Sequence, residues 1–522
     1  MVNHRKSLRS LRGRKRLQFG HAALVGVSVG IVAVLFQICL GVVFEYAHLL
    51  LRWSEKHTFG IVVFPCFCAL CAWLAVTITK KYCPEASGSG IPQVKGVLIQ
   101  LGSIRWLRVL WVKFIGGLLV IGTGFTLGRE GPTVHLGAAI GLGLTKLLHL
   151  PSKLRLHYVA CGAGAGLAAA FNAPLAGFVF VLEELRKEFS ALTYGTALVA
   201  TVLADVVTRV VIGAQPSLYI PMENEAELLS LKILPAAIVV GICAGVMGGS
   251  YSMLLVKTVR YTQKNPNLWF VRNRALIVGF AVGLIGVLLP ISLGPGGLII
   301  KEFFQSGEGI QQTLVVVFAL LLLKIVLNIA CYAISAPGGI FTPMLAQGAL
   351  MGLCLALLLQ TFLPTIPFQA WAVLAMAAYF TGVVQAPLTG VILTFEMTGG
   401  YNLLFPLMVA CMLSYFVAQM VGGRPVYEAL LRATLSTDKA KLELFNEPKL
   451  LDLVVEPQSF MAGKRLMDLN LPAAALVLTI TRAGEPLIPC GGTRLIAGDQ
   501  LTIAISNSSP ETPQQLLDMA QG

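Results

Sequence analysis

Long apolar runs recur so often in this 522-residue sequence that they exclude a water-soluble fold. Two of them, His21–Phe44 and Ile310–Leu323, contain no charged residue. Over the whole chain 56% of residues are hydrophobic and only 12% are charged. A helix of about 20 apolar residues is long enough to cross the hydrocarbon core of a bilayer. We therefore predict an α-helical protein that spans the membrane several times and has the lipid bilayer as a partner.

The positive charge of the chain is concentrated beside these predicted spans. The formal net charge is +14, and seven basic residues precede the first acid, Glu45: Arg5, Lys6, Arg9, Arg12, Arg14, Lys15 and Arg16. Because Lys and Arg accumulate in cytoplasmic loops, residues 1–19 are predicted to form a cytoplasmic arm. No small-residue cleavage site follows, so a removed signal peptide is not expected. The membrane accounts for this charge, and no nucleic-acid partner is expected.

The eleven cysteines lie largely in apolar segments, as Cys66, Cys68 and Cys161 do. Such positions are typical of small buried hydrophobic residues and differ from the spacing of metal ligands or of a disulfide framework. We expect no metal and no cofactor.

A single acid stands in the middle of a long apolar stretch. Glu130, in the pentapeptide 128–132 (GREGP), is the only Asp or Glu between Glu85 and Glu183. A carboxylate inside a bilayer costs about 2.5–3.5 kcal/mol on insertion scales, so it is a functional-site hypothesis by default. Pro132 suits the first turn of a helix, and the unpaired N–H groups of a helix that starts here would attract an anion. The alternative is a loop glutamate at the membrane edge.

Two ordered motifs occur twice in the chain at almost the same offset. Gly128–Leu144 aligns without gaps with Gly339–Leu355, an offset of 211 residues, and both begin with the pattern G-x-x-x-P. Ala173–Gly177 then matches Ala386–Gly390, and the acid six residues after each Ala-Gly stretch repeats as Glu183 and Glu396, an offset of 213. The chain is therefore predicted to be an internal duplication with repeats of about 20–215 and 231–435. Duplicated transporters, often inverted, bind substrate where interrupted helices of both halves converge.

The coarse helix pattern agrees with this organisation. Spans are predicted at about 20–53, 59–79, 106–125, 193–211, 233–256 and 275–289. Gly/Pro-interrupted stretches at 88–92, 128–132 and 338–343 are candidates for one shared anion site built from helix N-termini. The run Gly162–Gly166 superficially resembles a dinucleotide loop, but no strand pattern precedes it, which favours close packing of helices through small residues.

The character of the sequence changes after residue 435. Residues 436–449 are predicted to be a charged linker. Short alternating runs at 451–455, 475–481 and 501–505 then predict a small cytosolic β-rich α+β domain over 450–522.

Four motifs in order resemble the CLC family of chloride channels and chloride/proton antiporters: GSGIP at 88–92, GREGP at 128–132, GGIFTP at 338–343, and the tyrosine of GGRPVY at 422–427. The resemblance covers roughly residues 20–435. It implies an inverted-repeat CLC-like fold and a homodimer with a separate anion pathway in each subunit. The functional residues that it implies are the anion-contacting hydroxyls of Ser89 and Tyr427, backbone N–H donors at Gly339, Ile340 and Phe341, and the gating carboxylate of Glu130.

The residue type at the position of Glu184 differs between the antiporters and the channels of this family. In its antiporters a glutamate here passes protons toward the cytoplasm, whereas its channels usually have an uncharged residue. The resemblance therefore implies a proton-transfer role for Glu184, with water and Arg186 expected to reduce the cost of its ionisation. The alternative is that Glu183 and Glu184 only cap the aqueous end of a helix. Glu183 and Glu396 are expected to be structural.

The C-terminal domain resembles the C-terminal subdomain of RCK modules, which regulate potassium conductance. The likeness is carried by residues 462–466 (AGKRL) and 498–501 (GDQL). It implies a prokaryotic protein whose C-terminal domain either senses an unidentified small-molecule ligand or reinforces the dimer.

The sequence as a whole predicts a secondary active transporter that exchanges chloride for protons and performs no enzymatic chemistry. We expect a multi-pass protein of the prokaryotic inner membrane with both termini in the cytoplasm. The alternatives are a passive chloride channel, a fluoride exporter and a potassium-linked regulator.

Overall fold

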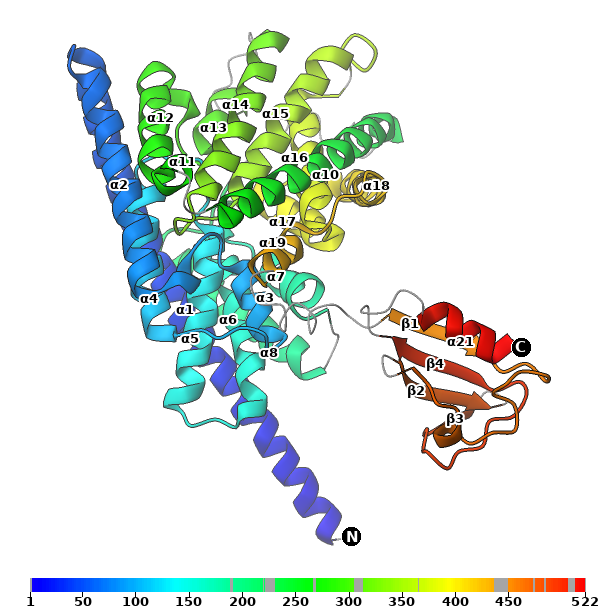
Figure 1. Ribbon diagram of the computed structural model, residues 1–522. Helices are drawn as coiled ribbons and strands as arrows, with labels where there is room; N and C mark the ends of the chain where they lie inside the picture. The colour runs from blue at the N-terminus through cyan, green and yellow to red at the C-terminus, as the bar shows by residue number, and fades with distance from the viewer. Residues whose placement is uncertain are drawn as a thin grey trace. The chain divides into compact units, whose positions relative to one another are not determined.

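The computed structural model describes residues 2–187, 191–218, 220, 231–265, 269–304, 313–364, 366–435, 449–472, 475–482, 485–505 and 512–521. The chain divides into two compact units, Met1–Ala433 and Thr434–Gly522. The first is helical and the second contains a small sheet (Figure 1). The predicted linker 436–449 lies outside the described residues, except that Lys449 already begins the first strand.

The helical unit contains two successive sets of helices. The first set is α1 (Val2–Lys56), α2 (Gly60–Tyr82), α3 (Ile91–Leu98), α4 (Trp106–Ile121), α5 (Glu130–Leu147), α6 (Ser152–Phe171), α7 (Pro174–Phe180) and α8 (Ala191–Val211). The second set is α10 (Leu234–Lys264), α11 (Trp269–Arg272), α12 (Arg274–Leu288), α13 (Gly297–Phe304), α14 (Leu314–Ala333), α15 (Phe341–Leu359), α16 (Phe368–Val384), α17 (Pro387–Thr398) and α18 (Leu404–Met420). A final helix, α19 (Val426–Leu435), follows both sets.

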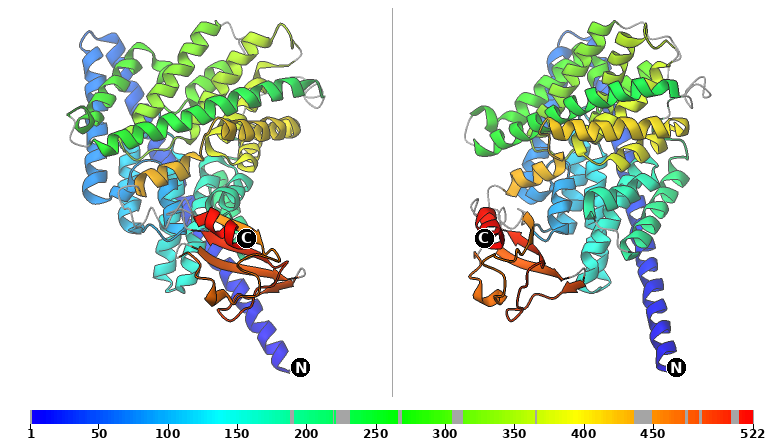
Figure 2. Two further views of the ribbon diagram at one scale, coloured as in Figure 1. Left: turned by 45° about the vertical axis from the view of Figure 1, so that its right-hand side comes forward. Right: turned by 90° about the vertical axis from the view of Figure 1, so that its right-hand side faces the viewer.

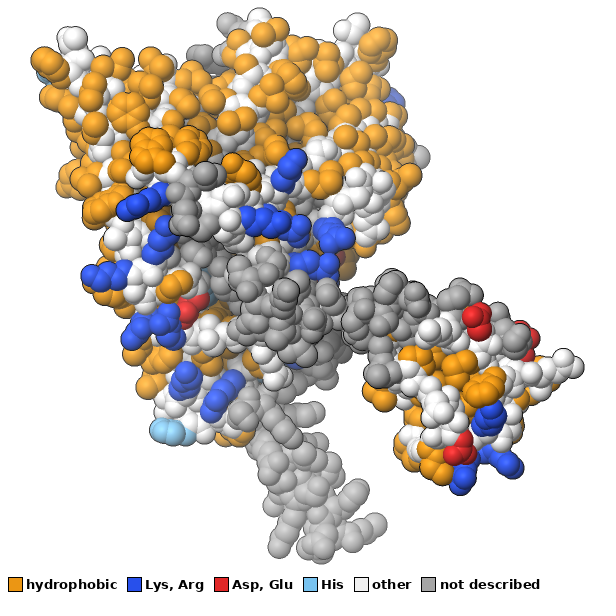
Figure 3. Space-filling model, in the orientation of Figure 1, with side chains coloured by type: hydrophobic (Ala, Val, Ile, Leu, Met, Phe, Trp, Pro, Cys, Tyr) orange, Lys and Arg blue, Asp and Glu red, His pale blue; other side chains and the backbone are white. Residues whose placement is uncertain are grey.

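Six helices in the described part of the chain are long and apolar enough to cross a membrane: α1, α2, α8, α10, α14 and α15. Their outer faces carry large exposed apolar side chains, and Figure 3 shows hydrophobic side chains over a broad area of the helical unit. Such a surface is stable in lipid and costly in water. The prediction of a polytopic helical membrane protein is confirmed. One boundary differs, because α1 begins at Val2 and the backbone of the predicted basic arm continues directly into the first span.

The two sets of helices pack in the same way. In the first set α1, α6 and α8 contact one another, and in the second set α10, α16 and α18 do the same (Figure 2). The loops that enter α5 and α15 pair with each other in antiparallel fashion, with Gly128 N–H donating to Gly339 O at 2.7 Å and Gly339 N–H to Gly128 O at 2.8 Å. The segments that lead into these two repeat-related helices therefore run in opposite directions, which agrees with the predicted inverted duplication.

The glycine run 162–166 lies inside α6 and is a packing surface. A Cβ atom on Gly162 would lie 2.2 Å from the carbonyl oxygen of Gly137 in α5, and one on Gly166 would lie 2.3 Å from that of Thr133. Only residues without a side chain let the two helices approach this closely.

The C-terminal unit is an antiparallel four-stranded sheet with one described helix. The strands are β1 (Lys449–Val454), β2 (Ala475–Arg482), β3 (Glu485–Leu487) and β4 (Gln500–Ile505), in the order β1-β4-β2-β3, and the helix is α21 (Thr512–Gln521). Leu453, Ile480, Ile503 and Leu516 lie in its buried core. The prediction of a small β-rich α+β domain is confirmed.

Candidate functional site

Three helix N-termini converge inside the helical unit, and each begins at one of the predicted Gly/Pro-interrupted stretches. They belong to α3, α5 and α15. The loops before α3 and α15 are also joined, because Gly88 N–H donates to Ala336 O at 3.1 Å and Gly338 N–H to Gly88 O at 3.0 Å. With the pairing of Gly128 and Gly339, this ties all three loops together. Helix N-termini carry partial positive charge and unpaired N–H groups, so their convergence favours an anion.

Two glycines are required for this convergence. Gly90 has φ +96°, a conformation that residues with a side chain rarely adopt. A Cβ on Gly131 would lie 2.4 Å from Ser89 Oγ and 3.1 Å from the Cα of Gly339. Ser89, Gly131 and Gly339 come from the three different loops, so the missing side chain of Gly131 is what allows them to meet.

The hydroxyl groups of Ser89 and Tyr427 are fully buried, and among the described residues neither has a hydrogen-bond partner. Buried hydroxyls are nearly always satisfied, so these two fit a site that receives an anion. Tyr427 is the second residue of α19 and is close enough to Tyr332, Glu184 and Glu130 to interact electrostatically with each. Tyr332 was missed by the sequence analysis. Its phenol oxygen accepts the backbone N–H of Ser89 at 3.5 Å, which adds a further phenol beside the loop that carries Ser89.

One of the three predicted backbone donors is not free to contact an anion. The N–H of Gly339 donates to Gly128 O and therefore joins the two repeats. The N–H groups of Ile340 and Phe341 have no protein acceptor among the described residues. The ring of Phe341 packs against Phe380 with ring centroids 4.6 Å apart, which fixes the backbone at this helix start.

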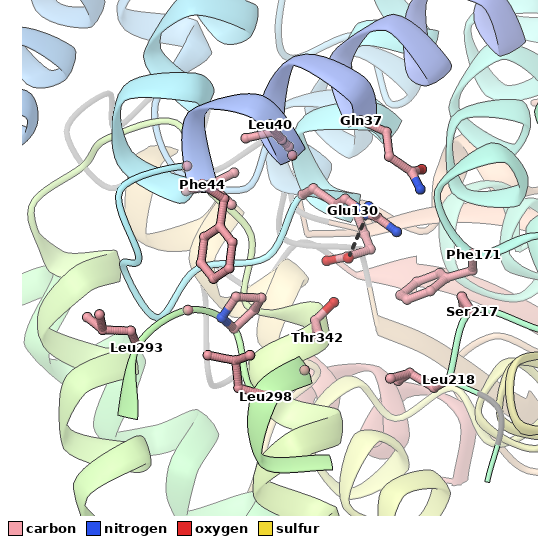
Figure 4. Close-up of a pocket in the computed structure, with 17 residues that line it drawn as sticks. Gln37, Leu40, Phe44, Glu130, Phe171, Ser217, Leu218, Leu293, Leu298 and Thr342 are labelled. Carbon is pink, nitrogen blue, oxygen red and sulfur yellow. Dashed lines mark ion pairs between the residues drawn. The ribbon is translucent and has the colours of Figure 1, made fainter. Parts of the chain in front are cut away.

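The carboxylate of Glu130 lies at the N-termini themselves. Its side chain is 4% exposed, and its Oε2 atom has no hydrogen-bond partner in the described part of the chain. Its nearest cation is Arg129, with Nε 4.0 Å from Oε1. Glu130 and Thr342 project toward one cavity of about 520 Å³, which is lined by residues of α1 and of the loop before α13 (Figure 4). Glu130 lines this cavity, whereas Ser89 and Tyr427 do not.

Glu184 lies in a π-helical turn, Val181–Arg186, that continues α7. The expectation that water and Arg186 would reduce the cost of its ionisation is not what the structure shows. Glu184 is only 2% exposed, and its Oε1 atom accepts a hydrogen bond from Lys95 Nζ at 2.8 Å. Lys95 belongs to α3, the helix that follows Ser89. The ion pair therefore joins the predicted proton carrier to the helix that begins at the anion site.

Glu183 and Glu396 form a reciprocal pair of helix caps. The carboxylate of Glu183 accepts the backbone N–H groups of Leu388 and Thr389 at the start of α17. In the same way Glu396, on α17, accepts those of Leu175 and Ala176 at the start of α7. Carboxylates stabilise helix N-termini, so each repeat supplies the cap of the other repeat's helix.

Two buried lysines were also missed by the sequence analysis. Lys113 Nζ donates to Ala86 O at 3.0 Å and to Gly88 O at 2.6 Å, and Lys324 Nζ donates to Ser292 O at 2.7 Å and to Gly294 O at 2.8 Å. Lys113 therefore fixes the loop that carries Ser89. The sequence held the signal, because the two lysines lie in apolar segments and are separated by 211 residues, the offset of the repeat.

This arrangement defines a class of protein. Two inverted helical repeats enclose a candidate anion site, where three helix N-termini and two buried hydroxyls lie. One buried carboxylate, Glu130, lies at these N-termini, and a second, Glu184, pairs with Lys95 of α3. Such a site is suited to moving an anion and protons across a membrane, as expected of a transporter.

The comparisons with known proteins give the family. The sequence profile described as voltage gated chloride channel matches residues 68–419, and the TrkA-C domain profile matches residues 450–510. The chain belongs to the voltage gated chloride channel (CLC) family and carries a C-terminal TrkA-C domain. Both resemblances found in the sequence are confirmed.

Relatives of known function are similar over most of their length. The chain is 35% identical over 430 residues to the H(+)/Cl(-) exchange transporter ClcA of Vibrio parahaemolyticus, covering 80% of this chain and 90% of that protein. It is 33% identical over 444 residues to the ClcA of Salmonella typhi, covering 82% and 90%.

Solved structures agree in fold. A slow cyanobacterial Cl−/H+ antiporter matches with a TM-score of 0.75 and 29% identity, over 81% of this chain and 99% of that one. A CLC-type fluoride/proton antiporter matches with a TM-score of 0.65 and 24% identity, over 80% and 98%, which shows a shared fold alone.

Proposed function

We propose that this protein exchanges chloride for protons across a membrane as a secondary active transporter. The observation that carries the proposal is the Glu130 carboxylate, buried at the converging N-termini with one oxygen that has no partner among the described residues. The similarity to curated H(+)/Cl(-) exchange transporters over 80% of the chain supports the same activity.

The anion passes between the hydroxyls of Ser89 and Tyr427 and the N–H groups of Ile340 and Phe341. These four groups replace part of the hydration shell of the anion. None of the four is a positively charged side chain, so the anion is not held tightly. Glu130 occupies the side of the site that faces the 520 Å³ cavity. Its carboxylate competes with the anion for the same N-termini when it is charged, and it leaves them when it takes up a proton. Anion passage and protonation of Glu130 are thereby linked.

Glu184 supplies protons from the opposite side. Its partner Lys95 stabilises the charged carboxylate in a buried position, where an unpaired charge would be very costly. Because Lys95 belongs to α3, the helix that follows Ser89, the proton route and the anion route meet on α3.

The passive chloride channel remains the principal alternative, since it shares the anion site but does not need a buried glutamate at position 184. Fluoride export is a second alternative, and the serine of the 88–92 motif argues against it. An enzymatic role has no support from the relatives, which are transporters.

A proton gradient imposed on chloride-loaded liposomes that contain the purified protein tests the proposal. Exchange predicts that chloride is driven against its own gradient by the proton gradient. A protein that only lets chloride run down its gradient is a channel. Replacing chloride by fluoride in the same assay tests the second alternative.

We extend the proposal to the domain boundaries, the membrane orientation, the oligomeric state and the ligand of the C-terminal domain. We assign the transport domain to 20–435 and the regulatory domain to 450–522, and the basic residues before Glu45 favour a cytoplasmic N-terminus. The protein acts in the inner membrane as a homodimer with one pathway in each subunit, as the resemblance to its family implies. The TrkA-C domain binds a small-molecule ligand. Cross-linking in the membrane and ligand-dependent changes in exchange rate check these points.

A further inference from the structure

A second cavity, of about 500 Å³, lies beside the last turns of α10 and the turn between α18 and α19. It is lined by four basic side chains, Lys257, Arg260, Lys264 and Arg424. None of the four pairs with an acid among the residues that the structure describes, and no acid lines the cavity. Four cations that no acid neutralises surround this cavity. They could bind an anion through several charge-assisted hydrogen bonds at once.

The cavity is a defined place in the fold. Ser252 Oγ donates to Arg424 O at 2.9 Å and Gln385 Nε2 donates to Gly423 O at 2.8 Å, so side chains of two helix regions fix the turn that carries Arg424. A Cβ on Gly423 would lie 2.9 Å from the Cα of Gly249, which shows how closely this turn approaches α10. The three basic residues of α10 follow the spacing i, i+3, i+7 and share one helix face.

The exposed surface changes from apolar to cationic toward the ends of both helices. On α10 the exposed apolar side chains, Tyr261 excepted, end with Met253 and Leu254, and Lys257 follows. On α18 they end with Met420 and Val421, and the next basic residue is Arg424. The exposed Tyr261 lies at the same level of α10, as tyrosines do at membrane interfaces. In Figure 3 Lys and Arg side chains gather below the broad hydrophobic surface.

The length of α10 agrees with a cavity near the surface of the membrane. Its 31 residues extend about 46 Å, whereas the hydrocarbon core is about 30 Å thick. A helix of this length tilts or extends beyond the hydrocarbon, and the cations Lys257, Arg260 and Lys264 favour an exit at its C-terminal end. The cavity is therefore lined by four cations and by the exposed apolar side chain of Met253, the combination that a lipid at the headgroup level requires.

We propose that this cavity binds the headgroup of an anionic phospholipid. The phosphodiester lies among Lys257, Arg260, Lys264 and Arg424, and the start of an acyl chain lies on Met253. The chemistry is that of basic pockets between membrane helices that hold anionic lipid headgroups. Because Arg424 and Ala429 flank Tyr427 in sequence, an occupied cavity holds the start of α19 and the tyrosine that it carries. The proposal rests on membrane insertion and is the same for an exchanger or a channel.

Calorimetric titration of the full-length protein in neutral detergent tests the proposal. The three probes are short-chain phosphatidylglycerol, short-chain phosphatidylcholine and inorganic phosphate. We expect phosphatidylglycerol to bind, phosphatidylcholine to bind far more weakly, and inorganic phosphate to compete only at high concentration.

The decisive comparison is between two triple variants. Lys257→Gln/Arg260→Gln/Lys264→Gln should weaken phosphatidylglycerol binding on the order of a hundredfold, at about fivefold per basic residue. Lys80→Gln/Lys81→Gln/Arg108→Gln removes three exposed cations that do not line the cavity and should bind as the wild type does. Arg260→Gln alone should lose about fivefold, which keeps the test open if the triple variant is unstable.

Three results would overturn the proposal. They are equal losses in both triple variants, unchanged binding in the cavity variant, and binding of inorganic phosphate as tight as that of the lipid, which would make this a soluble-phosphate site. Since lipid binding is measured without transport, a failed lipid site leaves the exchange assay unaffected, and a failed exchange assay leaves the lipid site standing.

Discussion

Replacing Lys95 by Met should uncouple protons from chloride, because Lys95 is the partner of the buried Glu184 carboxylate. The two side chains are 2.8 Å apart, and their exposed fractions are only 9% and 3%. Removing one partner of a buried pair costs about 3–5 kcal/mol if the remaining charge stays. A factor of ten in proton affinity corresponds to about 1.36 kcal/mol. Without Lys95, the proton affinity of the Glu184 carboxylate should therefore rise by a factor of about 10²–10⁴. The carboxylate then keeps its proton instead of standing charged and unpaired in a buried position.

The expected result for Lys95→Met is chloride flux that continues while proton movement falls strongly and recovers toward higher pH. Both fluxes are measured in liposomes across a series of pH values, and the melting temperature is followed in detergent. The double variant Lys95→Met/Glu184→Gln carries no lone buried charge. It should regain thermal stability at high pH without regaining proton movement.

The matched control is Lys187→Met, which breaks the pair with Glu428. That pair is 3.4 Å long and the lysine side chain is 58% exposed, so its loss should cost less than about 1 kcal/mol and leave coupling intact. If Lys95→Met melts and exchanges as the wild type does, or loses chloride flux and proton movement together, Lys95 does not act on Glu184 as argued.

Further variants test the other parts of the account. Glu130→Gln should abolish proton coupling while anion flux persists, and loss of anion flux with intact proton transport would refute its gating role. Tyr427→Ala should weaken anion binding more than Tyr427→Phe, which keeps the bulk, and wild-type binding in both would show that the ring only packs. Glu183→Gln should lower stability by about 1 kcal/mol through a weakened helix cap and keep exchange. In the C-terminal unit the bidentate contact of Arg482 holds the pKa of Asp499 below its ordinary value of 3.8. The stability from this contact is therefore present above pH about 3.8 and is lost as the pH falls below it, and hydrogen exchange in the full-length chain should show that Asp499→Asn removes this acid dependence.

Much of the fold followed from short motifs because each motif has a strict backbone requirement. Helix starts after the Gly/Pro stretches could be placed from Pro132 and its counterpart Pro343, and the repeat offset related the two halves. The repeat related Gly128 to Gly339 in sequence, but the two hydrogen bonds between them could not be foreseen, since a repeated motif does not show that its two copies touch. It uses the N–H of Gly339, which the sequence analysis had assigned to the anion.

Contacts between distant segments were the part that the sequence could not supply. The partner of Glu184 was expected among its neighbours in sequence and is instead Lys95, 89 residues away. Nothing in the apolar sequence around Lys95 distinguishes a buried partner from a basic residue at the membrane edge. Glu183 and Glu396 were expected only to be structural. Each of them caps a helix of the other repeat, and this depends on how α7 and α17 pack against each other.

Proton movement driven by a chloride gradient tests the central claim most directly. Liposomes containing the wild-type protein receive an inward chloride gradient and no proton gradient, and the pH inside is followed with and without Glu184→Gln. We predict outward movement of protons against the pH gradient that develops, abolished in Glu184→Gln while chloride flux continues. Chloride flux without proton movement in the wild type would contradict the exchanger, and equal proton movement in Glu184→Gln would contradict the route through Glu184.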